Sequence, residues 1–213
     1  MIISEDRIVY LPNFAELTPT HTDLQLPGEP EKRIVCLANL REQKDHMTLL
    51  RAFNDFHTQH PDWHLLLVGE DSNNTYSTSL KAYIAKEGLE DVVHILGSRS
   101  DSADILLAST IGVLASVSEG LPVALLEYGL AKLPVVCTDV GQCSEVLDHG
   151  SCGVLVPPAK PEELANALAA LASSCDQRAT YVSALYARVQ RKYGRGAVVG
   201  ELMKLYRSVL HVQ

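Results

Sequence analysis

Two glutamates, Glu119 and Glu127, stand eight positions apart in the run EGLPVALLE, whose other side chains are apolar. A carboxylate accepts hydrogen bonds from hydroxyl groups, and within an apolar helix it must be hydrogen-bonded or face a polar cleft. The helical rise from Leu121 to Glu127 is about 9 Å at 1.5 Å per residue, which suits two sugar-like rings of an extended ligand. A capping glutamate plus a glutamate on a solvent-exposed stripe explains the pattern equally well, so the residues alone leave both interpretations open.

A second group of polar residues, Asn39, Arg41 and Lys44, follows the apolar run 33–38. A lysine beside a helix N-terminus suits a phosphate, because the ammonium adds a point charge to the free backbone N–H donors. Asp45 is the residue type expected at the N-cap of the next helix. A solvated loop lysine is the commoner alternative, so the position after a strand favours a phosphate site only modestly.

Further candidates stand after three other apolar runs: Gly97 and Arg99, Gly120 and Leu121, and Gly141 and Glu145. Gly120 lets a ligand approach the backbone just before a helix whose first turn we expect at Pro122, where free N–H groups attract anions. The glycine at 141 offers similar donors, although a lone glycine in a turn is a weak signal. Arg99 and Asp101 can also be explained as a surface ion pair, which contributes little energy.

Several alternative chemistries lose their main support. The sequence has no GxGxxG after its first predicted strand and no GxxxxGK[ST], which disfavours NAD-type and P-loop sites. No Asp-x-Asp cluster suggests a metal-chelated diphosphate, so Lys44 and helix amides would have to bind such a group. The spacing of His57, His60 and His64 suggests a metal site. A solvated helix end and turn is the simpler interpretation. We therefore expect neither a metal nor a cofactor.

Strand-like and helix-like runs alternate from residue 33 onward and place these candidates. The strand candidates are 33–38, 64–69, 92–97, 111–116, 133–138 and 152–157. The helix candidates are 45–59, 76–88, 102–109, 161–173, 177–193 and 196–212. This rhythm predicts βαβ units and a parallel sheet, and strands apolar on both sides predict helices on both faces. The fold class is α/β, a Rossmann-like open sheet that binds ligands at the carboxyl ends of its strands.

Composition narrows the class of partner and the environment. The 213 residues carry a formal net charge of −8, which argues against generic nucleic-acid binding. The five cysteines are an odd number without a CxxC pair, as expected in a reducing compartment. No signal-peptide pattern opens the sequence and no apolar run reaches the length of a membrane span. We expect a cytoplasmic protein.

The order of these motifs resembles the C-terminal, donor-binding domain of GT-B glycosyltransferases of family 4, also called group 1. The resemblance covers most of the chain, from RIVCLANLREQKDHMTLLRAF through SVSEGLPVALLEYGLAKLPVVCTDVGQCSEVL to PEELANALAAL. Two glutamates separated by seven residues and followed by LPVV and TDVG are specific in this order. Two departures stand out. Ala38 and Asn39 replace a usual Gly-Arg pair, leaving Arg41 as a candidate substitute, and Tyr128 and Leu133 stand where Ala and Gly are frequent.

The resemblance implies a retaining transferase that moves a hexose-type sugar from a nucleotide sugar to a polysaccharide or glycolipid, without a metal ion. The two catalytic residues would be Lys44, which would neutralise the diphosphate, and Glu119, which would contact the donor sugar. Glu127 would contact the ribose. Backbone amides at Gly120 and Leu121 would serve the sugar or phosphates. Asn39 and Arg41 would lie nearby, Gly97 and Arg99 would border the base, and Gly141 to Glu145 would border the pocket.

The resemblance also implies a domain division. Residues 1–32, with a strand-like run at 7–11, would lead from an N-terminal acceptor-binding domain, and 33–213 would form the nucleotide-sugar-binding domain with its C-terminal helices. Alone, such a domain would bind donor but turn over little. Its expected partners are the donor and that N-terminal domain, through which it could touch the inner membrane surface. A nucleotide-sugar epimerase of the same fold and a non-catalytic nucleotide-sensing domain remain alternatives.

Overall fold

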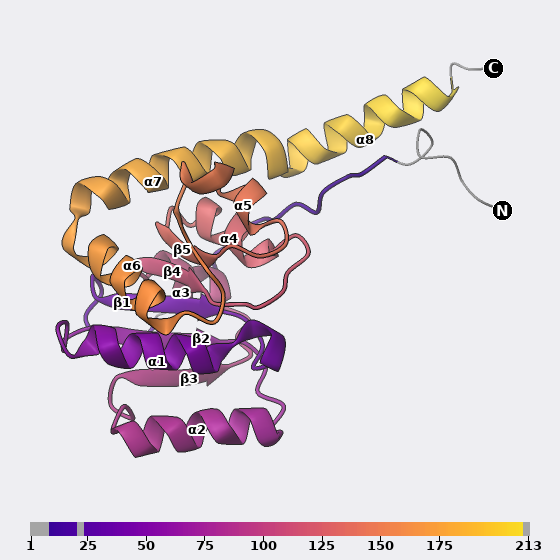
Figure 1. The fold of residues 1–213 in the computed structure, drawn as a ribbon. Helices are drawn as coiled ribbons and strands as arrows, with labels where there is room; N and C mark the ends of the chain where they lie inside the picture. Colours follow the sequence, from indigo (N-terminus) through magenta and orange to yellow (C-terminus); the bar gives the residue numbers. More distant parts are fainter. Residues whose placement is uncertain (1–8, 21–23, 211–213) are drawn as a thin grey trace.

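The computed structural model describes residues 9–20 and 24–210. Six parallel strands form one sheet in the order β3-β2-β1-β4-β5-β6 (Figure 1). The strands are β1 (Arg33–Leu37), β2 (His64–Val68), β3 (Val93–Gly97), β4 (Ile111–Leu114), β5 (Val135–Thr138) and β6 (Val154–Val156). The predicted α/β fold with an open parallel sheet is confirmed, and every strand predicted from residue 33 onward is present.

Helices connect the strands and close the chain. They are α1 (His46–His57), α2 (Thr75–Glu87), α3 (Ser102–Leu107), α4 (Val123–Leu130), α5 (Cys143–Val146), α6 (Pro161–Ser173), α7 (Cys175–Arg188) and α8 (Arg195–Leu210). A 3-10 helix at Glu42–Lys44 precedes α1, and a π-helix at Val189–Tyr193 joins α7 to the short break before α8. Capping fixes the start of α1 as predicted, since the Asp45 carboxylate accepts a hydrogen bond from the backbone N–H of Thr48 at 3.2 Å.

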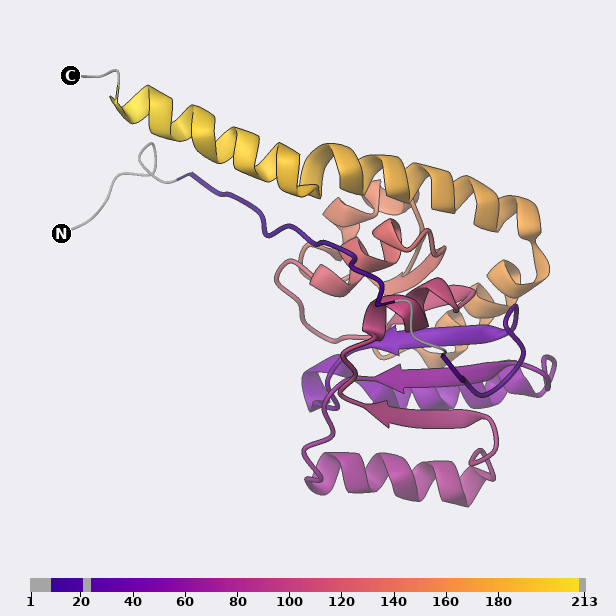
Figure 2. The same ribbon diagram turned by 180° about the vertical axis from the view of Figure 1, so that it is seen from behind.

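Helices cover both faces of the sheet. Helices α1 and α6 pack against each other in front of the sheet in Figure 1. From behind, in Figure 2, α3 lies on the opposite face, together with the segment that leads into β1. Residues of the four inner strands are therefore buried on both sides, and Ile34, Leu66, Val113 and Val136 are all fully buried, whereas the edge strands β3 and β6 are mostly half-buried. This double burial explains the uninterrupted apolar strands of the sequence.

The chain before β1 departs from the expectation of a strand at residues 7–11. Val9–Leu11 form no strand, and residues 7 and 8 lie outside the described part of the chain. Tyr10 is 61% exposed and pairs with no neighbouring strand, so its backbone has no ladder to join. Farther along, Ala15 is buried and the Thr20 hydroxyl donates to Asp104 at 2.6 Å, which holds this segment against the body.

Helix α8 projects from the body, and residues 9–14 run in the same direction beside it (Figure 1). Its exposed apolar side chains are Val199, Leu202, Met203, Tyr206, Val209 and Leu210, and Val9, Tyr10 and Phe14 are also exposed. So many exposed apolar side chains close together are unusual on a solvent-facing surface and mark a contact region. Within the described residues, no helix combines the length and apolar character needed to cross a bilayer.

Candidate functional site

The strand order reverses between β1 and β4, and a cavity of about 490 Å³ lies at the carboxyl ends of these two strands. Open α/β sheets bind ligands at this kind of switch point. Its lining residues are Leu37, Ala38, Asn39, Lys44, Val68, Gly69, Leu114, Glu119, Leu121, Pro122, Val123, Ala124 and Glu127. The fold thus brings together five of the predicted site residues, Asn39, Lys44, Glu119, Leu121 and Glu127, from two separate segments of the chain.

The two residues predicted to be catalytic, Lys44 and Glu119, are in direct contact. The Lys44 ammonium donates to Glu119 Oε1 at 2.6 Å, and the Ser116 hydroxyl donates to the same oxygen at 2.6 Å. The Glu119 side chain is only 7% exposed, so this ion pair offsets much of the cost of burying the carboxylate. The second oxygen, Oε2, has no donor among the described residues and can accept a hydrogen bond from a ligand.

The loop that carries Glu119 is fastened from two sides. The Thr138 hydroxyl at the end of β5 donates to the Ser116 carbonyl at 2.6 Å, and the Gln43 amide donates to the Ser118 carbonyl at 2.8 Å. Gly141 has a left-handed φ of +54°, and a Cβ at this position would collide with the Glu119 carbonyl. Gly141 therefore allows the loop after β5 to lie directly against the loop after β4.

Glu127 stands on α4 and faces the cavity without an internal partner. No described residue donates a hydrogen bond to its carboxylate, and burial raises the pKa of Glu127. A partly buried carboxylate without a partner is costly unless a ligand or water satisfies it. A ligand with hydroxyl groups could donate the hydrogen bond that the Glu127 carboxylate lacks. The sequence predicts Pro122 in the first turn of α4. Instead it is the N-cap residue, in extended conformation, and the helix begins at Val123.

Backbone donors at the start of α4 complete this side of the cavity. No described group accepts a hydrogen bond from the N–H of Gly120 or Leu121, whereas the Gly120 carbonyl accepts from Gln142 N at 3.1 Å. Leu121 lines the cavity, and Gly120 is exposed beside it. These two amides therefore remain available to an anionic or hydroxyl-bearing ligand.

Three predicted residues, Arg41, Gly97 and Arg99, do not line this cavity, whereas Asn39 lines it with its side-chain oxygen already engaged. Asn39 itself is committed, because its side-chain oxygen accepts from Glu70 N at 2.9 Å, and Arg41 lies 4.0 Å from the Glu70 carboxylate in an exposed pair. Gly97 ends β3 with a φ of +68°, and two strands, β2 and β1, lie between β3 and β4. Arg99 is engaged by Asp101 at 2.6 and 2.7 Å, the surface pair that the sequence left open.

The structure turns Glu145 away from the expected position. Its carboxylate accepts from Lys192 at 2.6 Å, and this pair lowers the pKa of Glu145. Glu145 lines a different cavity of about 340 Å³ with Tyr10, Gln142 and Lys192. A cation from the distant π-helix attracts this carboxylate, and nothing in the local sequence around TDVGQCSE signals that partner.

The structure adds a residue that sequence reasoning treated only as a departure. Tyr128 is fully buried and its hydroxyl accepts from Leu37 N at 2.7 Å while donating to the Val113 carbonyl at 3.1 Å. Its ring lies over Gly112, where a Cβ would come within 2.8 Å of the ring. A glycine on β4 and a tyrosine sixteen positions later were the available signals, but no local rule couples them.

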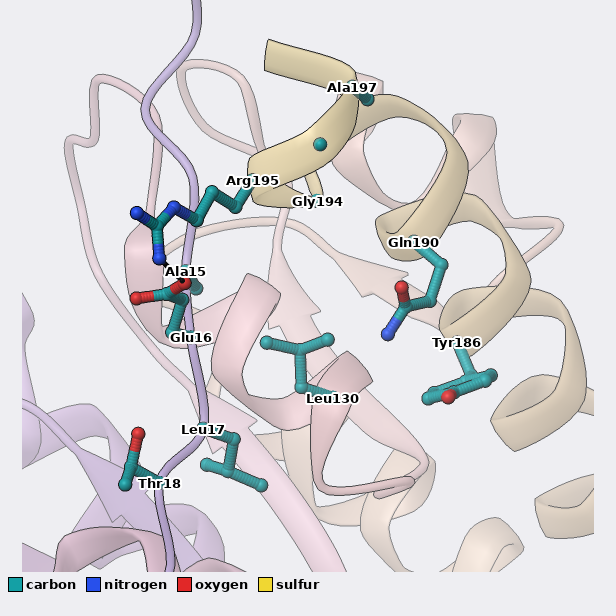
Figure 3. A pocket seen from close by; sticks show the side chains of 11 residues that line it. Ala15, Glu16, Leu17, Thr18, Leu130, Tyr186, Gln190, Gly194, Arg195 and Ala197 are labelled. Atoms are coloured by element: carbon teal, nitrogen blue, oxygen red, sulfur yellow. Dashed lines mark hydrogen bonds and ion pairs between the residues drawn. The ribbon is translucent and has the colours of Figure 1, made fainter. Parts of the chain in front are cut away.

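A larger hollow lies elsewhere. A cavity of about 620 Å³ lies between residues 15–18, the end of α4 and the start of α8. The ion pair between Arg195 and Glu16, 3.2 Å long, lies on one side of it (Figure 3). Tyr186 and Gln190 point toward it from the opposite side. None of the residues that the sequence singled out for chemistry lines this hollow.

The histidine and cysteine patterns resolve as structural. His57 stacks on Phe53 and His60 on Phe56, and within the described residues no group of three or more potential metal ligands occurs. All five cysteines are free thiols, and only Cys175 is exposed. The buried cysteines act as small apolar side chains, as predicted.

The structure is that of a Rossmann-like α/β domain with a cavity at the switch point of the sheet. Residues 31–174 match the family model of glycosyl transferases group 1. This match covers more than half of the chain, so the chain belongs to the glycosyl transferases group 1 family. The family that the sequence resembles is therefore confirmed.

Individual relatives agree with this assignment. The chain is 29% identical over 212 residues to the phosphatidyl-myo-inositol mannosyltransferase of Mycobacterium leprae, covering 94% of this chain and 54% of that protein. It is similar to the C-terminal domain of a glycosyl transferase group 1 family protein (LpcC) from Francisella tularensis, with a TM-score of 0.73, 25% identity and coverage of 84% and 96%. Anabaena Alr3699/HepE, crystallised with UDP and glucose, shares the fold with a TM-score of 0.78 at 24% identity, covering 84% of this chain and 49% of that one. The chain spans about half the length of the curated relatives it matches.

Proposed function

We propose that this chain binds the nucleotide-sugar donor of a retaining glycosyltransferase that transfers a hexose-type sugar to a polysaccharide or glycolipid acceptor. The observation that carries the proposal is the convergence of Lys44, Glu119 and Glu127 on one cavity at the switch point. Family membership supports the class of reaction. The relatives named as a mannosyltransferase and as a protein bound to UDP and glucose support the class of donor.

Each polar group suits a different part of such a donor. The free carboxylate of Glu127 can accept two hydrogen bonds from the vicinal hydroxyls of a ribose. Glu119 Oε2, which has no donor among the described residues, can accept from a hydroxyl of the sugar. The Lys44 ammonium uses one of its three N–H donors on Glu119 and can direct the others to the diphosphate.

Departure of the nucleoside diphosphate places negative charge on its outer phosphate. Fixed donors aimed at that charge lower the barrier because they need no reorganisation as the bond breaks. Lys44 and the unengaged amides of Gly120 and Leu121 are such donors at one end of the cavity. We propose that they perform this role without a metal ion, and that Glu119 orients both the sugar and Lys44.

The acceptor side of the reaction requires a second domain. The chain spans about half of its relatives' length, and the exposed apolar side chains of α8 and of residues 9–14 offer a contact surface for such a domain. We propose that this domain binds the acceptor, that the chain alone turns over little donor, and that the assembled enzyme works in the cytoplasm, at the inner membrane surface when its acceptor is a lipid.

Titration calorimetry tests the proposal directly. The chain is titrated with UDP-, GDP- and ADP-sugars, each with and without EDTA, and with the Glu127→Ala variant as a comparison. We expect one nucleotide class to bind, EDTA to leave the Kd unchanged, and Glu127→Ala to weaken binding about tenfold or more, as for loss of a charged hydrogen-bond acceptor. Absence of binding to every donor, or an unchanged Kd in Glu127→Ala, would refute it.

A further inference from the structure

The hydrogen-bond ladder between β1 and β4 is interrupted at its carboxyl end. Alternate residues of β1 face opposite neighbours, and Ala38 N donates to Val68 O on β2, so the N–H of Leu37 faces β4. On β4, Gly112 N donates to Pro134 O beside β5, so the Val113 carbonyl faces β1. The register pairs Val35 with Gly112. Continued regularly, the ladder would join Leu37 N to Val113 O directly.

The Tyr128 hydroxyl occupies the place of that bond. It accepts from Leu37 N at 2.7 Å and donates to Val113 O at 3.1 Å, whereas a direct N–H···O bond spans about 2.9 Å. Burial raises the pKa of Tyr128, so the hydroxyl stays protonated and able to donate. The two central strands are therefore held apart by one inserted oxygen, with both backbone groups satisfied.

The ring that carries this oxygen is fixed in place. Tyr128 is 0% exposed and its ring packs against Gly112, where the Cβ of any larger residue would come within 2.8 Å of the ring. Leu37, which carries the bridged N–H, and Leu114, which follows Val113, both line the donor cavity. Glu127, the neighbour of Tyr128 on α4, lines its wall. The Tyr128 hydroxyl therefore connects the separation of β1 and β4 to the position of the Glu127 carboxylate, which is proposed to bind the ribose.

We propose that Tyr128 is a positioning residue that wedges β1 and β4 apart and sets the width of the cavity in which Lys44, Glu119 and Glu127 bind the donor. This inference rests on the proposed function, because the width matters only if a donor occupies the cavity. Without the hydroxyl, Leu37 N and Val113 O lose their shared partner and are left unpaired. The ends of β1 and β4 are then no longer fixed relative to Glu127.

Tyr128→Phe removes the hydroxyl and keeps the ring. We expect the Leu37 amide to exchange with solvent at least tenfold faster, and the Kd for the nucleoside diphosphate and for the nucleoside to rise together by at least tenfold. Tyr193→Phe is the matched control, because Tyr193 is equally buried but its hydroxyl has no hydrogen-bond partner in the described structure. Its Kd should stay within twofold of wild type.

Two further variants separate positioning from general stability. Leu168→Ala removes a fully buried side chain on α6 that does not line the cavity, so it should lower the melting temperature and leave the Kd unchanged. Gly112→Ala retains the hydroxyl but crowds the ring, and it should weaken both ligands as Tyr128→Phe does even if the latter fails to fold.

The outcomes distinguish the two proposals. If wild-type protein binds a nucleoside diphosphate and either folded variant, Tyr128→Phe or Gly112→Ala, keeps the wild-type Kd, the positioning role is wrong. A loss of affinity in Leu168→Ala equal to that in Tyr128→Phe would likewise overturn it. Wild-type protein that binds no nucleoside diphosphate would overturn the proposed function and, with it, donor positioning. An unchanged exchange rate at Leu37 in Tyr128→Phe would refute the wedge itself.

Discussion

Substitution of Lys44 by alanine separates the phosphate from the rest of the ligand. If the ammonium binds the diphosphate, Lys44→Ala should weaken a nucleoside diphosphate far more than the corresponding nucleoside. The structure places this ammonium in the cavity wall with one N–H donor on Glu119 and two donors available. The phosphate contact therefore does not require the ion pair with Glu119 to break.

The size of the effect follows from this geometry. A hydrogen bond to a charged group contributes about 1.5–3 kcal/mol, which corresponds to roughly 10- to 150-fold in Kd. The side chain is 25% exposed, so solvent screens part of the interaction and the lower half of that range is expected. The nucleoside lacks the phosphate, and its Kd should change by no more than about threefold, the indirect effect of releasing Glu119.

Calorimetry at fixed ionic strength measures both ligands on wild type and variant. Lys81→Ala is the matched control, because Lys81 also forms a 2.6 Å ion pair, with Asp71, but does not line the cavity. It should leave both Kd values unchanged. Equal losses for nucleoside and diphosphate in Lys44→Ala would refute the phosphate role, since they would show that the lysine only holds Glu119 in place.

Two other predictions concern Glu127 and Gly141. Burial raises the pKa of Glu127, so its carboxylate is protonated at a higher pH than an ordinary glutamate; nucleotide affinity should fall as the pH is lowered from 7.5 toward 5. Glu127→Gln should bind more weakly at pH 7.5 and lose this pH dependence, measured by titration at each pH, and a wild-type Kd independent of pH would contradict the role of the carboxylate. Gly141→Ala should destabilise the protein by about 2–3 kcal/mol, because it combines a left-handed φ with a collision against the Glu119 carbonyl. Gly150→Ala, with a φ of +94° and no atom within 4 Å of its Cβ, should cost about 1 kcal/mol in the same melting experiment, and equal costs would refute the collision.

The fold was predictable because its signals are local. Pro161 with two following glutamates marks the start of α6, and the helix runs over 161–173 as predicted. Asp45 was likewise predictable as the N-cap of α1, because a short polar side chain there can accept a hydrogen bond from a free backbone N–H. Where prediction failed, at Val9–Leu11, the run has strand-like residues but no neighbouring strand, and strand formation depends on pairing rather than on propensity alone.

The site was predictable only in part, since its contacts join distant segments. The rule that ligands lie at the carboxyl ends of strands was enough to bring Lys44, Glu119 and Glu127 together. It could not show that Lys44 donates a hydrogen bond to Glu119, 75 positions away in the sequence, or that Glu145 forms an ion pair with Lys192. Such pairings depend on side-chain reach across the tertiary fold, which single-sequence patterns do not encode.

The role of Tyr128 illustrates the same limit most clearly. In the sequence it is a bulky residue where the family more often has alanine, and a buried helix explains it without further assumption. Its hydroxyl bonds residues 91 and 15 positions away, on two different strands. The accompanying glycine at 112 is meaningful only once the ring is seen to lie on it.

Mapping of backbone amide shifts by NMR tests the central claim most directly. On addition of the nucleoside diphosphate that binds best, we predict that shifts concentrate at Asn39, Lys44, Gly120 and Glu127, around the cavity between β1 and β4. Shifts gathered instead at Glu16 and Arg195 in the hollow of Figure 3, or no shifts at all, would contradict the assignment of this cavity as the donor site.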